Sequence, residues 1–440
     1  MEPAALPPEE FAARRARVYE AIGPEAVALV QGAPAPGGFR RFRQTNEFHY
    51  LAGPAEPHAY LLLDGQRQAA TLYLPHPGAL GERCGVEHVA PPERLALDLA
   101  GRLWRRPALT VFTPLSPAEG AGATRDTLVL AAGRAASDPW DGAPAREARL
   151  AGHLRGRFPQ VAVADLSPLL DRLRLRKSPA EVALLRAAAR LCAHGLLAAL
   201  AVTRVGAYEY ELEAAAQAAF RRGSAQGEGY CAIVASGPNS WDGHYSANSR
   251  QLCAGDLVLM DYAPDCGYYT SDIGRMWPAD GTYRPAQREL YGFMVAYHRS
   301  LLARIRPGVT AEVILGEAAA EMRQVLERTT FSKQIYAEAA ARALAFDGHL
   351  SHPVGMAVHD VGDYRPDPLV PGLVFSVDPQ LWVPEERLYV RVEDTVAVTA
   401  DGCENLTGTV PQDPEALERQ MQGAAGLSPT HIRLESSPIK

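Results

Sequence analysis

The sequence predicts an α+β fold, and two observations lead to this prediction. Four segments have helical composition with polar breaks between them, for example at Thr203 to Gly206, and they cover residues 179–201, 208–222, 285–305 and 310–326. Between and after these segments lie short apolar runs that end in Asp or Glu, as expected for antiparallel strands that present polar side chains. This mixture of helices and antiparallel strands is typical of the α+β class.

The elements are assigned in chain order. Residues 9–23 form an amphipathic helix, a Pro/Gly-rich break follows at 32–38, and short strands alternate with polar turns to about residue 165. The helices described above come next, and Thr310 suits the N-cap of the last one. At 440 residues, length alone suggests about three domains, but the placement of the motifs argues for two. Residues 424–440 are poor in apolar side chains and are expected to be flexible.

The stretch DLVLMDYAPDCGYYTSDIGRMWP predicts a hairpin that brings two carboxylates together. Asp256–Asp261 forms one strand and Tyr268–Trp277 its partner, and a turn at Cys266-Gly267 places Asp261 directly opposite Asp272. Like charges in such positions, with Cβ atoms roughly 4.5–5.5 Å apart, are destabilising unless a proton or a cation lies between them. A register shifted by one residue would instead put the two Asp on opposite faces, as ordinary polar residues.

Three later segments add polar residues at strand or loop positions. In LYVRVEDTVAV, alternation puts Arg391 and Glu393 on one face, and a core strand that points both charges inward needs partners for them. Asp378 ends an apolar strand just before Pro379, and His352 lies in a segment too broken for a long helix. The candidates in chain order are Asp261, Asp272, His352, Asp378 and Glu393. Four carboxylates and one imidazole suit two divalent ions of the manganese or cobalt kind better than a thiolate-type structural zinc.

Composition fits a soluble intracellular enzyme. The formal charge of -7 and the pI near 6.0 give no basic footprint for nucleic acid. The six cysteines contain no CxxC pair and fit a reducing compartment. The N-terminus lacks the apolar core of a secretory signal, and no run approaches the roughly 18–20 apolar residues of a membrane span. We therefore expect a cytoplasmic protein without nucleic-acid or membrane partners.

The motifs and their order resemble the metallopeptidases of the methionine aminopeptidase, prolidase and aminopeptidase P group, whose catalytic domain has the pita-bread fold. The resemblance is closest to the proline-specific branch. FRQTNEFHYLAGPAEPHAYLLL is similar to the opening of the aminopeptidase P N-terminal domain, and LRLRKSPAEVALLRAAA resembles the helix that opens the catalytic domain. The resemblance implies a smaller mixed α/β N-terminal domain at 1–172, a pita-bread catalytic domain at 173–423 and a tail at 424–440.

The resemblance also implies how the five candidates bind metal. Asp261 would hold one ion, Asp272 and Glu393 would bridge both ions, and His352 and Asp378 would hold the other. A hydroxide that bridges two cations is a nucleophile at neutral pH, because the cations lower the pKa of bound water. We expect manganese, with cobalt or zinc as alternatives.

The resemblance implies further catalytic residues. Glu393 would take the proton of the hydroxide. His244 in SGPNSWDGHYSAN and His359 in VHDVG match two family histidines that contact the substrate and stabilise the tetrahedral intermediate. A satisfied core or loop histidine is the alternative for each of them. Arg391, which shares a strand face with Glu393, completes the catalytic candidates. The expected substrate is a small peptide with proline after the scissile bond, and the expected assembly is a homodimer or a larger homo-oligomer.

The chain departs from the family pattern at three places near the site. Asp378-Pro379-Gln380 replaces the usual Glu-Pro-Gly, and Asp is one methylene shorter than Glu. Gly274 replaces a Thr that commonly follows Asp-Ile, so that a supporting hydroxyl is missing. Gly348-His349 replaces a usual His-Gly, which puts a substrate-binding role of His349 in doubt. None of these changes removes a type of ligand, and together they indicate an altered substrate geometry.

Three functions are compatible with these residues. The first is an Xaa-Pro aminopeptidase or dipeptidase with two metal ions. The second is a metal-dependent hydrolase or lyase of a small non-peptide molecule on the same fold, which the substituted surroundings of the site would suit. The third is a noncatalytic binding homologue, which would lack bound metal. The sequence leaves the native metal, the substrate length and the oligomeric state open.

Overall fold

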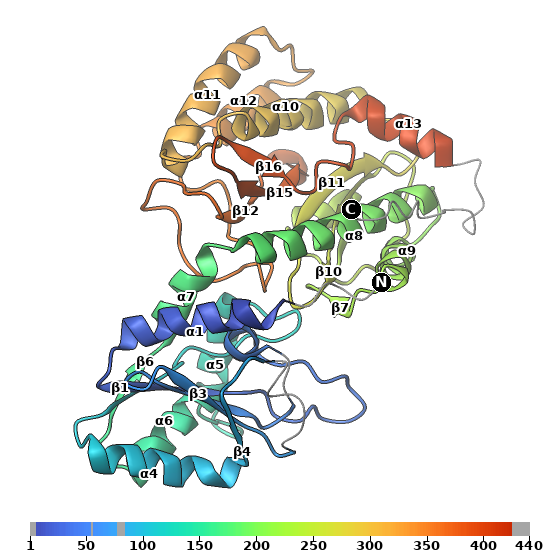
Figure 1. The fold of residues 1–440 in the computed structure, drawn as a ribbon. Coiled ribbons are helices and arrows are strands. Elements are labelled where there is room, and N and C mark those ends of the chain that lie inside the picture. Colours follow the sequence, from blue (N-terminus) through green and yellow to red (C-terminus); the bar gives the residue numbers. More distant parts are fainter. Residues whose placement is uncertain (1–5, 54–55, 77–83, 425–440) are drawn as a thin grey trace. The chain divides into compact units, whose positions relative to one another are not determined.

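The computed structural model describes residues 6–53, 56–76 and 84–424 (Figure 1). The chain divides into two compact units. The N-terminal unit contains the described residues up to Glu181 together with the short segment His359–Gly362. The C-terminal unit contains 182–358 and the described residues from Asp363 on. The boundary predicted between residues 172 and 173 stays a prediction, and the tail predicted at 424–440 lies outside the described residues except for Ala424.

The N-terminal unit is built on a mixed six-stranded sheet with the order β4-β3-β2-β1-β5-β6. The β1–β2 and β2–β3 pairs are antiparallel, and the other three pairs are parallel. Its strands are β1 (Ala26–Gln31), β2 (Tyr60–Asp64), β3 (Ala69–Tyr73), β4 (His88–Ala90), β5 (Thr110–Thr113) and β6 (Ala162–Asp165). Its helices are α1 (Pro8–Ile22), α2 (Asn46–Ala52), α4 (Leu95–Arg105), α5 (Arg125–Ser137), α6 (Arg146–Arg157) and α7 (Ser167–Leu175). Residues of the sheet such as Leu29 and Leu62 pack with Leu99 of α4 and Leu154 of α6, which confirms the predicted mixed α/β domain.

The C-terminal unit is built on an antiparallel sheet with the order β12-β15-β11-β9-β8, and β16 pairs with β15 beside this path. Two short antiparallel ribbons, β7–β10 and β13–β14, accompany it. The strands are β7 (Gly227–Glu228), β8 (Ile233–Ser236), β9 (Leu257–Asp261), β10 (Pro264–Asp265), β11 (Ile273–Pro278), β12 (Val374–Val377), β13 (Gln380–Val383), β14 (Leu388–Arg391), β15 (Glu393–Val398) and β16 (Cys403–Asn405). Asp261, Arg391 and Glu393 lie on these strands, Asp272 directly precedes β11, and Asp378 directly follows β12.

The helices of the C-terminal unit confirm the four predicted ones and add two. They are α8 (Pro179–Val202), α9 (Glu209–Arg222), α10 (Pro285–Leu302), α11 (Ala311–Arg328), α12 (Gln334–Leu344) and α13 (Pro414–Ala424). Thr310 is the N-cap of α11, because its side chain accepts a hydrogen bond from the Val313 N–H. The α10 helix contacts β12, β13 and β14, and Cys192 and Leu196 of α8 belong to the same buried hydrophobic cluster as Ile273 of β11.

One described helix, α8, is long and apolar enough to cross a membrane by length and composition alone, contrary to the expectation from the sequence. Half of its apolar window is buried inside the structure. Leu185, Ala188 and Cys192 on this helix are fully buried, so packing in the core accounts for its apolar composition. The core helix of a globular protein commonly passes the same test, and the evidence for a membrane span is weak.

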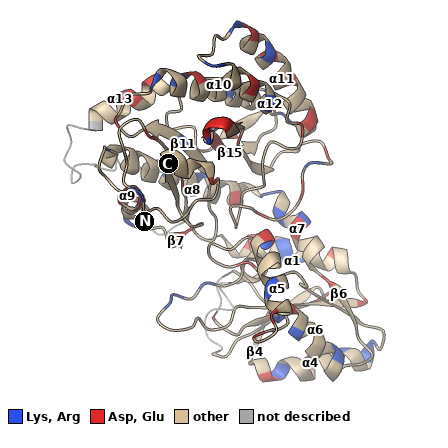
Figure 2. Cartoon of the chain, turned by 180° about the vertical axis from the view of Figure 1, so that it is seen from behind, with Lys and Arg blue, Asp and Glu red and all other residues tan. Residues whose placement is uncertain are grey.

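Acidic and basic residues are interspersed along the helices of both units (Figure 2). Some charged side chains are nevertheless inaccessible to solvent. Arg14, Arg15, Arg174 and Arg275 are among the largest fully buried side chains of the described residues. Buried charges are tolerated when they have partners: Arg14, Arg174 and Arg275 pair with carboxylates, and Arg15 donates hydrogen bonds to the carbonyl oxygens of Leu51 and Cys84.

Candidate metal centre

The hairpin that carries Asp261 and Asp272 has a different register from the predicted one. Gly274, and not Asp272, lies opposite Asp261. The turn centres on Gly267 and Tyr268, which both have positive φ, one residue later than predicted. Moving the centre of a turn by one residue shifts the strand register by two, and residues two apart share a face. The two carboxylates therefore lie diagonally to each other, still on one side of the hairpin.

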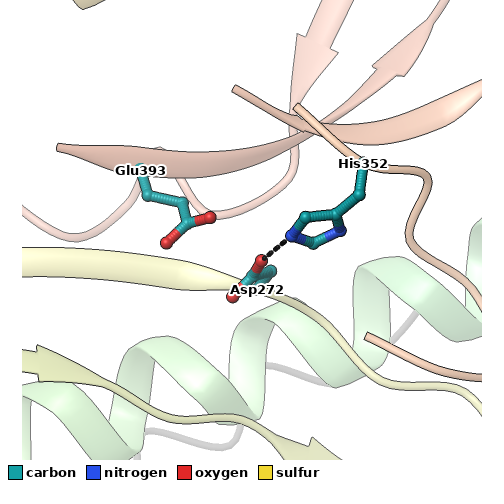
Figure 3. Close-up of side chains that lie close together, drawn as sticks. All are labelled: Asp272, His352 and Glu393. Carbon is teal, nitrogen blue, oxygen red and sulfur yellow. Dashed lines mark ion pairs between the residues drawn. The ribbon is translucent and has the colours of Figure 1, made fainter. Parts of the chain in front are cut away.

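Three of the predicted metal ligands converge on one point. Asp272, His352 and Glu393 each place one ligand atom within 4.8 Å of the others (Figure 3). His352 Nε2 lies 3.2 Å from Asp272 Oδ2, while its Nδ1 faces the Pro353 carbonyl oxygen at 3.2 Å. A hydrogen bond from Nδ1–H to this carbonyl leaves Nε2 as the nitrogen that can bind a metal.

Arg391 connects the two remaining carboxylates to this group. Its Nη2 lies 2.5 Å from Asp261 Oδ2, and its Nη1 lies 3.4 Å from Glu393 Oε2 and 3.8 Å from Asp378 Oδ2. All five predicted ligands and Arg391 thus belong to one buried cluster, in which His352 is the most exposed, with a quarter of its side chain accessible.

Sequence reasoning missed the polar residues that hold the carboxylates in place. Tyr230 Oη donates to Asp261 Oδ1 at 2.5 Å and to Asp272 Oδ1 at 3.0 Å. Ser376 Oγ donates to Glu393 Oε1 at 2.6 Å, and the Thr395 hydroxyl accepts from the Asp272 N–H at 2.8 Å. Gln380 Nε2 donates to Asp378 Oδ2 at 2.6 Å. Of these residues only Gln380 had a signal in the sequence, because it stands where the family has glycine.

Burial disfavours the ionised form of several carboxylates in this cluster. Burial, assisted by the charge of Glu393, raises the pKa of Asp261 and Asp272, and raises the pKa of Asp378 to about 7. Burial also opposes ionisation of Glu393, but Arg391 and His352 outweigh it and lower the pKa of Glu393. One arginine therefore does not neutralise the cluster, and further positive charge is needed before all four carboxylates ionise.

The residues present fit divalent metal ions. Asp378 Oδ1 and Glu393 Oε2 are buried atoms without a hydrogen-bond partner. Buried carboxylate oxygens of this kind are costly unless they bind a cation. Four carboxylates and one imidazole also match the ligands that hard and borderline divalent ions prefer. The donors, the crowding of negative charge and the two oxygens without a hydrogen-bond partner all agree with a metal centre.

The predicted substrate-contacting histidines lie in different units. His244 follows the 3-10 helix Gly237–Trp241 in the C-terminal unit, is exposed, and its N–H donates to Asp242 Oδ1 at 3.3 Å. His359 belongs to the N-terminal unit, where its Nδ1 lies 3.1 Å from Asp126 Oδ2. His349 is exposed and packs edge-on against Phe346, with ring centroids 5.2 Å apart. The roles of these histidines toward a substrate stay predictions.

Gly274 does more than remove the hydroxyl group that the family usually has at this position. A Cβ at this position would lie 3.0 Å from Glu393 Oε2 and 3.1 Å from Arg391 Nε. The space that a larger residue would need is therefore already taken by the side chains of the cluster. The three departures near the site include at least one, at residue 274, that is matched by the packing of its neighbours.

Comparison with known families and proteins agrees with this site. Residues 183–400 match the model of metallopeptidase family M24, and residues 11–90 match the model of the aminopeptidase P N-terminal domain. The Xaa-Pro aminopeptidase of Escherichia coli (strain K12) is 31% identical over 450 residues, which cover 94% of this chain and 98% of that protein. The Xaa-Pro aminopeptidase of Haemophilus influenzae is 30% identical, with 95% of this chain and 98% of that protein covered.

Solved structures give the same result. A structure of aminopeptidase P from E. coli with the inhibitor Pro-Leu matches with a TM-score of 0.76 and 29% sequence identity, and the match covers 96% of this chain and 99% of that one. The similarity thus extends through both units and confirms the expected pita-bread fold with a preceding N-terminal domain.

Proposed function

This chain belongs to metallopeptidase family M24, and we propose that it is a metal-dependent Xaa-Pro aminopeptidase, which releases the residue that precedes proline at the N-terminus of a peptide. The observation that carries the proposal is the buried cluster in which Asp272, His352 and Glu393 converge, with Asp261 and Asp378 joined to them through Arg391. A small-molecule hydrolase and a noncatalytic homologue are less well supported, because relatives that align over nearly their whole length are Xaa-Pro aminopeptidases.

Each residue of the cluster has a proposed task. Asp261 would hold one metal ion, His352 and Asp378 the other, and Asp272 and Glu393 would contribute to both. Divalent ions at these residues supply Lewis acidity toward the scissile carbonyl and a hydroxide nucleophile at neutral pH. Glu393 is also proposed to act as the general base.

Neighbouring residues keep the cluster in position for this task. Tyr230 donates to two of the carboxylates and so fixes their spacing. Arg391 is proposed to balance the charge of Asp261 and Glu393 while metal binds and leaves. His244 and His359 are proposed to donate hydrogen bonds to the substrate, because a developing oxyanion requires fixed donors.

The identity of the ions, the assembly and the location form the remaining part of the proposal. Two manganese ions are proposed, with cobalt or zinc as alternatives, since oxygen ligands outnumber the single nitrogen ligand. A homodimer or a larger homo-oligomer is proposed on the resemblance to the family. The cytoplasm is the proposed location, and the six unpaired cysteines are compatible with its reducing conditions.

Peptide cleavage with matched substrates tests the proposal. The purified full chain is loaded with manganese, cobalt or zinc and assayed with Xaa-Pro dipeptides and Xaa-Pro-Xaa tripeptides, each beside its Xaa-Ala counterpart. We expect release of the first residue from the proline peptides and little from the alanine ones. Absence of proline-dependent cleavage with all three metals would reject the proposed activity, and metal analysis of the same samples would then separate a small-molecule enzyme from a noncatalytic homologue.

A further inference from the structure

The segment VHDVG places His359 next to a carboxylate of the N-terminal unit. His359 Nδ1 lies 3.1 Å from Asp126 Oδ2, in hydrogen-bond range. These residues are 233 positions apart in the sequence, and both belong to the N-terminal unit. A third of the His359 side chain is exposed, so the ring is held at one edge and accessible at another.

Asp126 is well placed to act as a fixed acceptor. It lies in the first turn of α5, where a carboxylate is favoured by the free N–H groups of the helix. Its Oδ1 accepts from the Thr127 N–H at 2.8 Å and from the Thr124 hydroxyl. Burial is the largest single influence on Asp126 and opposes its ionisation, but the hydrogen bonds from Thr124, His359 and the Thr127 N–H together outweigh it and lower the pKa of Asp126. Oδ1 is therefore occupied by hydrogen bonds at the start of α5, and Oδ2 faces the imidazole of His359.

A set of buried charges fixes the backbone on both sides of this contact. We call it the buried charge cluster, and its members are Glu47, Glu119, Arg125, Arg174, Lys177 and Asp360. On the side of the histidine, the adjacent Asp360 pairs with Arg174 at 2.5 Å and with Lys177 at 3.0 Å. All three of these side chains are about 1% exposed.

The same cluster also holds the backbone next to Asp126. Arg125, the neighbour of Asp126 at the start of α5, places its Nη2 2.7 Å from Glu47 Oε1. Arg174 closes the connection, because it pairs with Glu119 as well as with Asp360. Breaking one partner of a buried pair is strongly unfavourable, so the backbone at His359 and at Asp126 cannot move away without disturbing these pairs.

From this arrangement we infer that Asp126 is a positioning residue for His359, which keeps the proton on Nδ1 and directs Nε2 toward the substrate. The inference rests on the proposed function, in which His359 contacts the substrate. A carboxylate at Nδ1 selects the tautomer and stabilises the imidazolium, in which Nε2–H is a donor. The oriented donor can then serve a developing oxyanion, as the proposed role of His359 requires.

A double-mutant cycle on the metal-loaded full chain tests whether Asp126 acts through His359. We expect Asp126→Ala to lower kcat about 10-fold or more with little change in KM, because the group acts on the transition state. In a His359→Ala background the same change should cause no further loss, since its effect depends on the imidazole. Asp138→Ala, which removes an exposed carboxylate just beyond the other end of α5, is the matched control and should leave kcat unchanged.

A spectroscopic arm tests the contact without using activity. In protein with ¹⁵N-labelled histidine, the His359 signals are assigned by their loss in His359→Gln, and their shifts report which nitrogen carries the proton. We expect Nδ1 to carry a proton in the wild type and the Nδ1–H population to fall in Asp126→Ala, with Asp138→Ala like the wild type. The inference would be overturned if the His359 signals were unchanged in Asp126→Ala. It would also be overturned if Asp126→Ala lowered kcat equally in the wild-type and the His359→Ala backgrounds. If the wild type does not cleave Xaa-Pro peptides but the tautomer shifts as expected, the proposed function fails and the contact stands.

Discussion

Arg391 and Asp261 are joined by a charge-assisted hydrogen bond, with 2.5 Å between Nη2 and Oδ2. The guanidinium can lie in this position because the residue opposite Asp261 in the hairpin is Gly274. A Cβ there would come within 3.1 Å of Arg391 Nε. The arginine, the aspartate and the glycine therefore form one packing unit within the candidate metal centre, although they come from three different strands.

Adding a methyl group at residue 274 should disturb the centre. Overpacking a tight site costs about 1–3 kcal/mol, so Gly274→Ala should weaken manganese binding by about 10-fold or more and lower turnover. Calorimetric titration of manganese into the demetallated protein measures the affinity. Gly292→Ala is the control, because a Cβ at that glycine meets no atom within 4 Å. Equal affinity in both variants would mean that Glu393 and Arg391 move aside freely.

Lengthening Asp378 to the residue usual in the family should also be harmful. Asp378 Oδ2 already accepts from Gln380 at 2.6 Å and lies 3.8 Å from Arg391 Nη1. An extra methylene in Asp378→Glu must displace one of these neighbours, at a cost of about 1–3 kcal/mol in metal binding or in turnover. Titration of the second metal ion into wild type and variant decides the matter. Tighter binding with faster Xaa-Pro cleavage would show that Asp378 is a compromise and not an adaptation.

Removing metal should abolish activity and lower the melting temperature. The four carboxylates repel each other when they ionise, and a ligand bound only to the folded state stabilises it by about 2.7 kcal/mol at a concentration of 100 times its Kd. Differential scanning calorimetry before and after chelation, with manganese added back as a control, measures the effect. Full activity in exhaustively demetallated protein would contradict the dinuclear mechanism.

Loss of either histidine that is proposed to contact the substrate should lower turnover without loss of metal. Removing one transition-state donor typically costs about 10²–10³ in rate, and we therefore expect this range for His244→Ala and His359→Ala. Metal content of the purified variants, measured by mass spectrometry, should equal that of the wild type. Metal loss in His359→Ala would place that histidine among the ligands.

A buried histidine outside the centre should make the protein sensitive to mild acid. His298 of α10 is fully buried with Nε2 3.4 Å from Asp394 Oδ2, and burial lowers its pKa to about 4, because it outweighs the attraction of Asp394. The unfolded chain binds a proton near pH 6.5 and the folded chain does not, so stability falls as pH decreases from about 6.5 to about 4.

The contribution of His298 amounts to at most about 3 kcal/mol over this range. Urea unfolding at several pH values measures the slope of stability against pH. In His298→Gln the slope between these pH values should become shallower, whatever the cost of the substitution itself. An unchanged slope would assign the acid sensitivity to other groups.

The sequence predicts which residues come together at this site better than it predicts their geometry. Polar residues in and beside the strands, with His352 in a loop, were expected to share a site, and the structure places all five of them and Arg391 in one cluster. The register of the hairpin was predicted wrongly, because Tyr268 has a positive φ. A positive φ is uncommon for residues other than glycine, and nothing in the sequence indicated it for this tyrosine. Because the register differs by two residues from the predicted one, Asp261 and Asp272 still lie on one face, as the prediction of a shared site requires.

Supporting residues were harder to predict. Tyr230 precedes β8 and has no motif around it, yet it contacts two carboxylates. Ser376 and Thr395 reach the centre only because β12 pairs with β15 in a register that places them opposite each other. Long-range pairing of this kind depends on the whole sheet and cannot be read from one segment.

The buried charge cluster has a consequence for how the chain can be divided. Asp360 supplies a carboxylate for Arg174 and Lys177, although it lies 179 positions after Glu181, where the first stretch of the unit ends. A fragment that ends at Glu181 would keep the pair of Arg174 with Glu119 but would leave the buried Lys177 without Asp360, and such a loss costs about 3–5 kcal/mol in comparable cases. The N-terminal unit is therefore complete only after most of the chain has been synthesised. A fragment whose end is chosen from the sequence alone would lack Asp360, and we expect it to fold less stably than the unit in the full chain.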